Sequence, residues 1–157
     1  MSGHHVETPV SAEDVRARLA AVHDPEIPAV SIVDLGMVEL VEVAGAEIHV
    51  ELLPTFVGCP ALEVIRESVV EALAPLGRPT SVEFTWRVPW TSDRISEQGR
   101  ASLAASGFAP PDDPAHVRCP YCDSSRVAMD SAFGPTACRS LFYCRDCRQP
   151  FEAFKPV

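Results

Sequence analysis

Two cysteine pairs with the same spacing, Cys119-Pro-Tyr-Cys122 and Cys144-Arg-Asp-Cys147, decide the fold of the C-terminal quarter. They are separated by 21 residues, so each pair can form a turn that presents two thiolates to one tetrahedral ion. Three stretches between and after the pairs are long enough for short strands, namely residues 126–129, 140–143 and 151–155. The core of such a ribbon is too small to fold without metal, so we expect an all-β, metal-stabilised module.

Zinc is the ion that we expect in this module, bound by Cys119, Cys122, Cys144 and Cys147. Iron in the same cage, or a cluster, stays open as the alternative, because four thiolates do not choose strongly between these metals. A closed four-cysteine site has no free coordination position, so its expected role is structural. Cys138 lies between the pairs and has three interpretations: a buried apolar side chain, an additional metal ligand, or a thiol that faces a partner.

The stretch Ala109-Pro-Pro-Asp-Asp-Pro114 separates the cysteine pairs from the rest of the chain. Three prolines in six residues cannot continue a helix or form a central strand. We therefore expect a first domain at 1–108, a Pro/Asp linker at 109–116 and the four-cysteine module at 117–157. Charge divides at the same place, because residues 1–111 carry 7 basic and 16 acidic side chains, whereas residues 112–157 carry 6 of each.

Hydrophobic periodicity predicts an α+β fold for the first domain. Apolar residues with helical spacing indicate three helices, at 11–22, 60–76 and 92–105; the first begins with a capping-box pattern at Ser11, and the second is expected to end at Gly77. Runs rich in Val, Ile and Leu and alternating apolar residues indicate three strands, at 31–43, 47–53 and 82–86, and a turn at Gly45 joins the first two into a hairpin. The order is helix, strand, strand, helix, strand, helix, which predicts a small sandwich with helices covering one sheet.

Cys59 is the one cysteine outside the C-terminal quarter, and it lies in Gly58-Cys59-Pro60 at a predicted helix start. Unpaired N–H groups and the helix dipole favour an anion there, so we expect a thiol with a lowered pKa and raised reactivity. The alternative interpretation is a buried cysteine that fits a tight turn. Thr55 lies just upstream and can reach the same pocket.

Acidic residues that can join Cys59 occur in the turn Asp24-Pro-Glu26-Ile-Pro28 and at Asp34. Asp24 and Asp34 either cap turns or line a site with Cys59, depending on how the strands bring them together. The sequence contains no phosphate-binding glycine loop, no Gly-x-Ser-x-Gly elbow and no His-Glu-x-x-His motif. We therefore expect that the chain is not catalytic alone.

Composition excludes several classes of partner. The 157 residues include 13 Lys and Arg against 22 Asp and Glu, and this net charge of −9 argues against nucleic acid and against an anionic membrane. No apolar run approaches the roughly 20 residues of a spanning helix. The polar start, Met1 to Thr8, lacks the pattern of a signal peptide, so a cytoplasmic chain with reduced thiols is expected.

Segments of the first domain resemble the SufT-like family of iron–sulfur assembly proteins. They are Asp24-Pro-Glu-Ile-Pro28, Ser31-Ile-Val-Asp-Leu-Gly-Met37, Pro54-Thr55 and Gly58-Cys-Pro60. The resemblance implies that Cys59 is a functional thiol and that Asp24, Glu26 and Asp34 are its recurrent acidic companions. It also implies the fold of that small domain.

Further segments resemble the PaaD family, the D components of bacterial phenylacetyl-CoA epoxidase systems. They are Val88-Pro-Trp-Thr-Ser-Asp93, Ile95-Ser-Glu97, Gly107-Phe-Ala-Pro-Pro111, Gly134-Pro-Thr-Ala-Cys138, Pro150-Phe151 and Phe154-Lys155. The resemblance implies an accessory protein for aerobic phenylacetate catabolism, which assists the assembly of iron or iron–sulfur centres in the oxygenase or the reductase. A transient iron or iron–sulfur cargo would accompany the structural zinc.

One thiol offers too few ligands for a cluster, so this interpretation requires a homodimer or a site shared with a partner. Two alternatives stay open. The chain is either a non-catalytic assembly subunit of the epoxidase, in which the thiol is incidental, or a general iron–sulfur cluster carrier that is not tied to phenylacetate.

Overall fold

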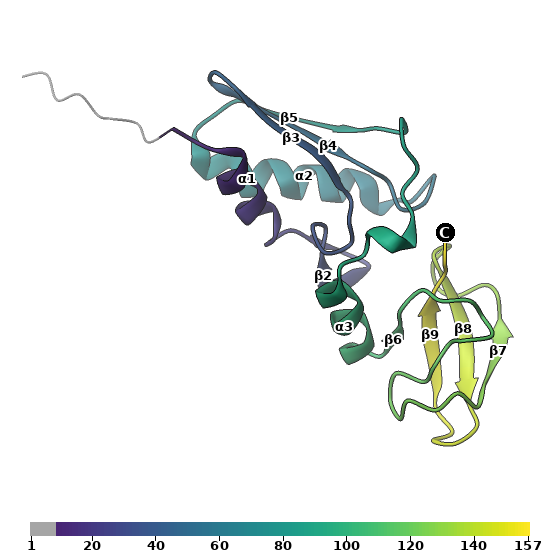
Figure 1. Ribbon diagram of the computed structural model, residues 1–157. Helices are drawn as coiled ribbons and strands as arrows, with labels where there is room; N and C mark the ends of the chain where they lie inside the picture. The colour runs from purple at the N-terminus through teal and green to yellow at the C-terminus, as the bar shows by residue number, and fades with distance from the viewer. Residues whose placement is uncertain (1–8) are drawn as a thin grey trace, which may run out of the picture.

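The computed structural model describes residues 9–157 and confirms the expected fold class, an α+β part followed by an all-β ribbon (Figure 1). The polar start Met1 to Thr8, on which the expectation about a signal peptide rests, lies outside the described residues. The first sheet contains β3 (Val38–Ala44), β4 (Glu47–Leu52) and β5 (Thr80–Phe84) in the order β3-β4-β5. Strands β3 and β4 form the predicted antiparallel hairpin.

The helices α1 (Ala12–Leu19) and α2 (Ala61–Leu73) lie together on one face of this sheet (Figure 1). Strand β5 runs parallel to β4, and this arrangement requires a crossover, which α2 provides. Ser11 caps α1 as predicted, because its hydroxyl accepts the Asp14 N–H at 3.1 Å while the Asp14 carboxylate accepts the Ser11 N–H at 2.8 Å.

The helical segment that follows α2 ends at the predicted glycine, Gly77. A short 3-10 turn, η1 (Ala74–Leu76), follows the helix, and Gly77 then adopts the left-handed conformation with φ of 66°. At the other end, Pro60 is the N-cap and α2 begins one residue later than predicted.

The prediction of one strand over 31–43 is wrong. Strands β1 (His23–Asp24) and β2 (Ile27–Ser31) form a separate two-stranded sheet, and the chain then turns before β3. The turn is stabilised by Asp34, which bonds to the Ser31 hydroxyl through both its N–H and its carboxylate, each at 3.0 Å. Gly36 has φ of +70°, and a Cβ there would lie 2.4 Å from the Arg94 carbonyl oxygen.

The predicted third helix is divided into η2 (Ser92–Arg94) and α3 (Glu97–Ala105). Ser96 interrupts it, since its backbone is extended and its hydroxyl caps α3 by accepting the Gly99 N–H at 2.9 Å. Gly99 allows α3 to approach the turn at Asp34, because a Cβ would lie 2.8 Å from the Asp34 carbonyl oxygen. Trp86, predicted as the end of the third strand, lies beyond β5 and is 62% exposed.

The ribbon (residues 108–157) has one sheet in the order β6-β9-β8-β7. Its antiparallel strands are β7 (Val127–Ser131), β8 (Arg139–Cys144) and β9 (Pro150–Phe154), close to the predicted stretches. A two-residue strand, β6 (Phe108–Ala109), pairs in parallel with β9. The sheet of the ribbon therefore includes the last residue of the predicted first domain and the first residue of the predicted linker.

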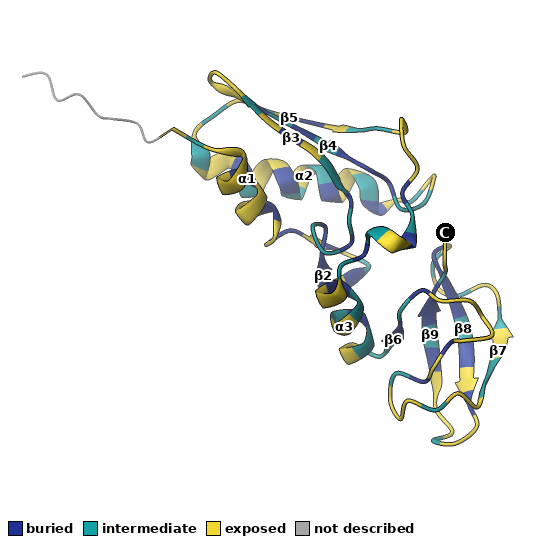
Figure 2. Ribbon diagram, viewed as in Figure 1, coloured by how far each residue is buried: buried dark blue, intermediate teal, exposed yellow. Residues whose placement is uncertain are grey.

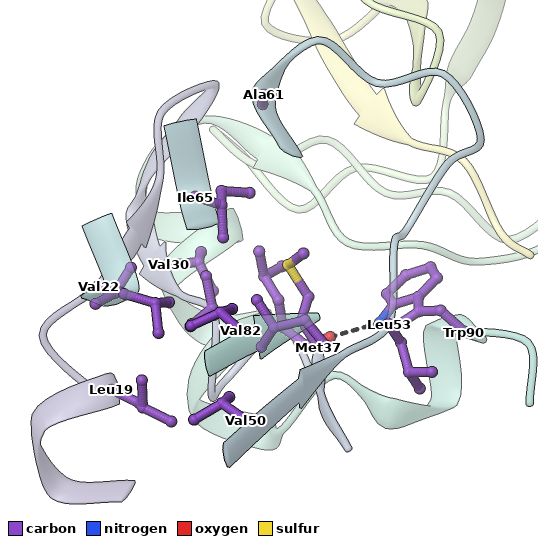
Figure 3. Packing of buried hydrophobic residues seen from close by; sticks show 14 of the residues in the cluster. Leu19, Val22, Val30, Met37, Val50, Leu53, Ala61, Ile65, Val82 and Trp90 are labelled. Atoms are coloured by element: carbon purple, nitrogen blue, oxygen red, sulfur yellow. Dashed lines mark hydrogen bonds between the residues drawn. The ribbon is translucent and has the colours of Figure 1, made fainter. Parts of the chain in front are cut away.

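The main core lies between the first sheet and its helices (Figures 2 and 3). Figure 3 shows part of it, including Met37, whose carbonyl accepts the Leu53 N–H at 2.7 Å. The second core is inside the ribbon and consists of Ala109, Val117, Cys119, Phe142, Cys144, Phe151 and Ala153. So few buried side chains agree with a module that depends on metal. Every helix in residues 9–157 is too short or too polar to cross a membrane.

The ribbon packs directly on the α+β part (residues 9–107). Two ribbon side chains, Cys138 and Phe154, belong to the main core rather than to the core of the ribbon. The ring of Phe154 meets Phe56 and Trp90 edge-on, with centroids 6.5 Å and 6.1 Å away. Arg139 also crosses the boundary and donates a hydrogen bond to the Glu26 carbonyl. These contacts fix where the residues before β8 lie.

Candidate functional site

The four predicted metal ligands of the ribbon come together. The sulfur atoms of Cys119, Cys122, Cys144 and Cys147 all lie within 4.8 Å of one another. The Sγ–Sγ distance is 3.6 Å both from Cys119 to Cys147 and from Cys122 to Cys144. A tetrahedral zinc ion with Zn–S bonds of about 2.3 Å places its sulfur ligands roughly 3.8 Å apart. The four-cysteine cage therefore fits zinc.

Both turns of the cage share one backbone geometry. The residue after each pair, Asp123 or Arg148, has a positive φ, 60° and 58° respectively. The N–H groups of Cys147 and Asp146 lower the pKa of the Cys144 thiol to about 7, which favours the thiolate that binds metal. No glycine marks these two turns, so their backbone conformation could not be predicted from the residue types.

Cys138 is not part of this cage. It lies in the loop before β8, where its side chain is buried and its sulfur is 3.0 Å from the Thr136 hydroxyl. The loop opens onto a cavity of about 250 Å³ at the boundary between the ribbon and the α+β part. The structure thus places Cys138 beside the second candidate site.

This interdomain pocket brings together most of the residues that were predicted to accompany Cys59. The α+β part contributes Cys59, Thr55, Asp24 and Glu26, and the ribbon contributes Pro135, Thr136, Ala137, Cys138 and Phe154. Asp34 is not among the lining residues. Its carboxylate instead accepts hydrogen bonds from Ser31 at 3.0 Å and from Ser96 at 2.6 Å, so it caps a turn and joins α3 to β2.

Cys59 is half-buried, and its position before α2 is the predicted one. The expected low pKa is wrong, however, because burial raises the pKa of the Cys59 thiol. The Ala61 N–H acts in the opposite direction, but the carboxylates of Glu26 and Asp24 and the Cys138 thiol raise this pKa further. Cys59 is therefore a neutral thiol at pH 7, and metal binding would replace its proton.

Asp24 is 6% exposed, and its carboxylate accepts the Glu26 N–H at 2.8 Å. Burial raises the pKa of Asp24, and this effect is reduced by the N–H groups of Glu26 and Ile27 and by the charge of Arg139. The Arg139 side chain is itself buried and forms an ion pair with Glu152 at 2.8 Å. A ribbon cation thus faces the acidic turn of the α+β part.

The chemistry of the pocket suits a soft cation. None of the described residues that line it is Lys, Arg or His, and two are thiols and two are carboxylates. Thiolates select soft metals such as iron in iron–sulfur clusters. A phosphate-bearing or carboxylate ligand would meet two acids among the lining residues, while the nearby Arg139 is paired with Glu152. The lining residues therefore suit a cation better than an anion.

Two family models match the two parts of the chain. Residues 12–84 match the family described as "Iron-sulfur cluster assembly protein", and residues 105–155 match "PaaD zinc beta ribbon domain". The Escherichia coli (strain K12) protein named as the D component of a "Putative 1,2-phenylacetyl-CoA epoxidase" is 37% identical over 95% of each chain. The chain belongs to the PaaD family.

Other proteins are similar to a smaller share of this PaaD family member. The Bacillus subtilis "Fe-S protein maturation auxiliary factor YitW" is 35% identical over 58% of this chain and 91% of its own. The crystal structure of a DUF59 domain from Bacillus anthracis has a TM-score of 0.55 at 30% identity, over 59% of this chain and 90% of that one. The Escherichia coli epoxidase component, by contrast, matches across the ribbon as well.

The sequence did not predict that residues of the ribbon line the pocket that contains Cys59. Cys138 was noted as a cysteine outside the two pairs, but nothing connected it to Cys59. No sequence feature indicated that Arg139 and Phe154 contact the α+β part, because a buried arginine and a core phenylalanine resemble ordinary strand residues in the sequence.

Proposed function

We propose that this PaaD family member is a maturation factor of the multicomponent phenylacetyl-CoA epoxidase in aerobic phenylacetate catabolism. It assists the assembly of iron or iron–sulfur centres in the oxygenase or the reductase and is not catalytic alone. The observation that carries the proposal is the Cys59 thiol on an acidic pocket, inside the part of the chain that matches the iron–sulfur assembly family. The similarity to the Escherichia coli epoxidase component supports the choice of client.

The electrostatics of Cys59 suit a transient ligand. Iron is the cargo, and it must exchange with the proton of a thiol whose pKa is raised. This exchange weakens binding relative to a site whose thiolates are already stabilised by N–H groups. A weakly held cargo can pass to a client, and the neighbouring carboxylates of Asp24 and Glu26 still attract a cation.

The zinc site has a different role in this proposal. Cys119, Cys122, Cys144 and Cys147 would hold a zinc ion that supplies the folding energy of the ribbon. The folded ribbon places Cys138, Arg139 and Phe154 against the α+β part. Zinc would therefore support the pocket from a distance and take no part in iron transfer.

A second candidate function is an assembly subunit of the epoxidase without a role for the thiol. It is favoured by an apolar side chain on the pocket wall, Val57, which is 87% exposed. Exposed apolar groups beside a cavity are typical of protein interaction sites. This function predicts a stable complex with the oxygenase or the reductase that survives the loss of Cys59.

A complementation experiment separates the two functions. A deletion strain receives the wild type, Cys59→Ser, or Val64→Ser, a control at an exposed position of α2. The maturation role predicts that Cys59→Ser still co-purifies with the epoxidase, while the oxygenase or the reductase is deficient in iron. Normal iron content with Cys59→Ser would contradict it and leave the assembly role.

A further inference from the structure

Two thiols from distant parts of the sequence line one cavity. Cys59 precedes α2 and Cys138 precedes β8, and both contribute to the wall of the interdomain pocket. The thiol of Cys138 contributes to raising the pKa of Cys59, which agrees with their proximity. Neither thiol is needed by the four-cysteine cage. Their juxtaposition is therefore not required by metal binding in the cage.

The loop that carries Cys138 is held firmly by its own backbone. The Gly134 N–H donates to the Arg139 carbonyl at 3.0 Å, and the Arg139 N–H donates to the Thr136 carbonyl at 3.2 Å. The Lys155 N–H binds the Cys138 carbonyl at 2.9 Å and ties the loop to the end of β9. The Cys138 thiol therefore has a fixed position on the cavity wall.

The ribbon is also anchored on both sides of this loop. Arg139, the next residue, bonds to the Glu26 carbonyl, and Phe154 packs edge-on against Phe56. Glu26 lines the same pocket as Cys59. The two thiols are thus positioned relative to each other by direct contacts between the ribbon and the α+β part.

We propose that Cys59 and Cys138 together bind the iron cargo, as two thiolate ligands that the α+β part and the ribbon contribute to one site. This inference rests on the proposed function and specifies its ligands. Binding forms two Fe–S bonds and breaks two S–H bonds, so two protons are released and no electron is transferred. One chain then supplies two ligands, and the site does not require the homodimer that a single thiol would.

The two-thiol site leaves coordination positions for a client. Iron–sulfur centres in proteins usually have four protein ligands, so two thiolates hold the cargo incompletely. Within residues 9–157, the ribbon cage is the one group of at least three Cys, His, Asp or Glu side chains whose ligand atoms all lie within 4.8 Å of one another. The pocket is therefore not a second closed cage, and client cysteines can complete the coordination and withdraw the iron.

The test uses the full-length, zinc-loaded protein under anaerobic conditions, titrated with ferrous iron alone and then with ferrous iron and sulfide. X-ray absorption at the iron edge counts sulfur neighbours, and metal analysis confirms that zinc is retained. For ferrous iron alone, the wild type should show two protein sulfur ligands per iron in a monomer. Cys138→Ser and Cys59→Ser should each lose one of them and bind iron about tenfold more weakly or worse.

Each outcome has a distinct meaning. Unchanged iron binding by Cys138→Ser, with loss in Cys59→Ser, would overturn the two-thiol site and keep the proposed function. A wild type that binds no iron by either titration would overturn both. Ser140→Ala is a control at a buried position of β8 outside the pocket and should bind iron normally. If Cys138→Ser does not fold, the sulfur count in the wild type still decides, because one sulfur per iron contradicts the proposal.

Discussion

The ribbon cage and the interdomain pocket use the same ligand atom in opposite ways. In the cage, four sulfur atoms lie within 4.8 Å of one another, and backbone N–H groups lower the pKa of Cys144 while burial raises that of Cys147. In the pocket, two thiols face two carboxylates, and burial together with these acids keeps Cys59 protonated. The number of sulfur ligands, rather than their type, therefore separates a permanent metal site from an exchangeable one.

The largest expected effect comes from breaking the cage. Cys144→Ser removes a buried ligand, and structural zinc in small modules contributes on the order of 10 kcal/mol to folding. We expect loss of zinc and unfolding of the ribbon, while α1 and the first sheet remain folded. Zinc analysis and amide hydrogen exchange of β7 to β9 measure this. A zinc-free ribbon with full protection of β8 would show that its core suffices alone.

The next largest effect concerns the packing of the ribbon on the α+β part. Phe154→Ala removes a buried ring that packs against Phe56 and Trp90, so we expect a loss of about 3–5 kcal/mol in the free energy of unfolding. Phe133→Ala is the matched control, because that ring is 82% exposed and its removal should change stability little. Urea unfolding followed by tryptophan fluorescence compares them. Equal effects would mean that the ribbon is not anchored at Phe154.

A smaller effect tests the charges of the pocket. Glu26→Gln removes one carboxylate that raises the pKa of Cys59, so this pKa should fall and more thiolate should form at pH 7. The rate of iodoacetamide alkylation of Cys59 should therefore increase, and its pH profile should shift to lower pH. Asp24, Cys138 and the Ala61 N–H also act on this thiol and remain in the variant.

Glu97→Gln serves as the control for that measurement, because Glu97 is exposed at the start of α3 and does not line the pocket. Its alkylation profile should match the wild type. An unchanged profile in Glu26→Gln as well would contradict the prediction, because it would show that the Glu26 carboxylate does not act on Cys59.

The smallest expected effect is the change in folding stability when the charge of Asp24 is removed. Burial raises the pKa of Asp24 in the folded state, so ionisation of Asp24 opposes folding once the pH exceeds its ordinary, unfolded value. Asp24→Asn keeps an oxygen for the Glu26 N–H and removes the charge, although it also loses the attraction to Arg139. We expect a modest gain in stability at pH 7 that disappears as the pH falls toward 3. Thermal unfolding across this range checks it, and a constant difference would contradict it.

Local signals in the sequence predicted much of the fold. The capping box at Ser11, the hairpin turn at Gly45 and the two cysteine pairs each depend on neighbouring residues, and each is confirmed. The strand over 31–43 was wrong for the opposite reason. Its apolar residues Ile32, Leu35 and Met37 are fully buried in a turn, and apolar runs do not distinguish a buried turn from a buried strand.

The candidate site was harder to predict because its properties are tertiary. The helix start at Cys59 indicated a reactive thiol, but burial and the distant side chains Asp24, Glu26 and Cys138 reverse that effect. Asp34 was predicted to accompany Asp24 beside Cys59, yet its carboxylate binds the Ser31 and Ser96 hydroxyls and does not line the pocket. Such outcomes depend on tertiary contacts, which no local motif encodes.

Native mass spectrometry of the full-length protein, after anaerobic loading with ferrous iron and sulfide, tests the central claim most directly. We predict that zinc and iron occupy the same chain together, and that Cys59→Ser loses the iron while it keeps the zinc. Iron that replaces zinc to the same extent in the wild type and in Cys59→Ser would contradict this claim, because the ribbon cage would then be the iron site.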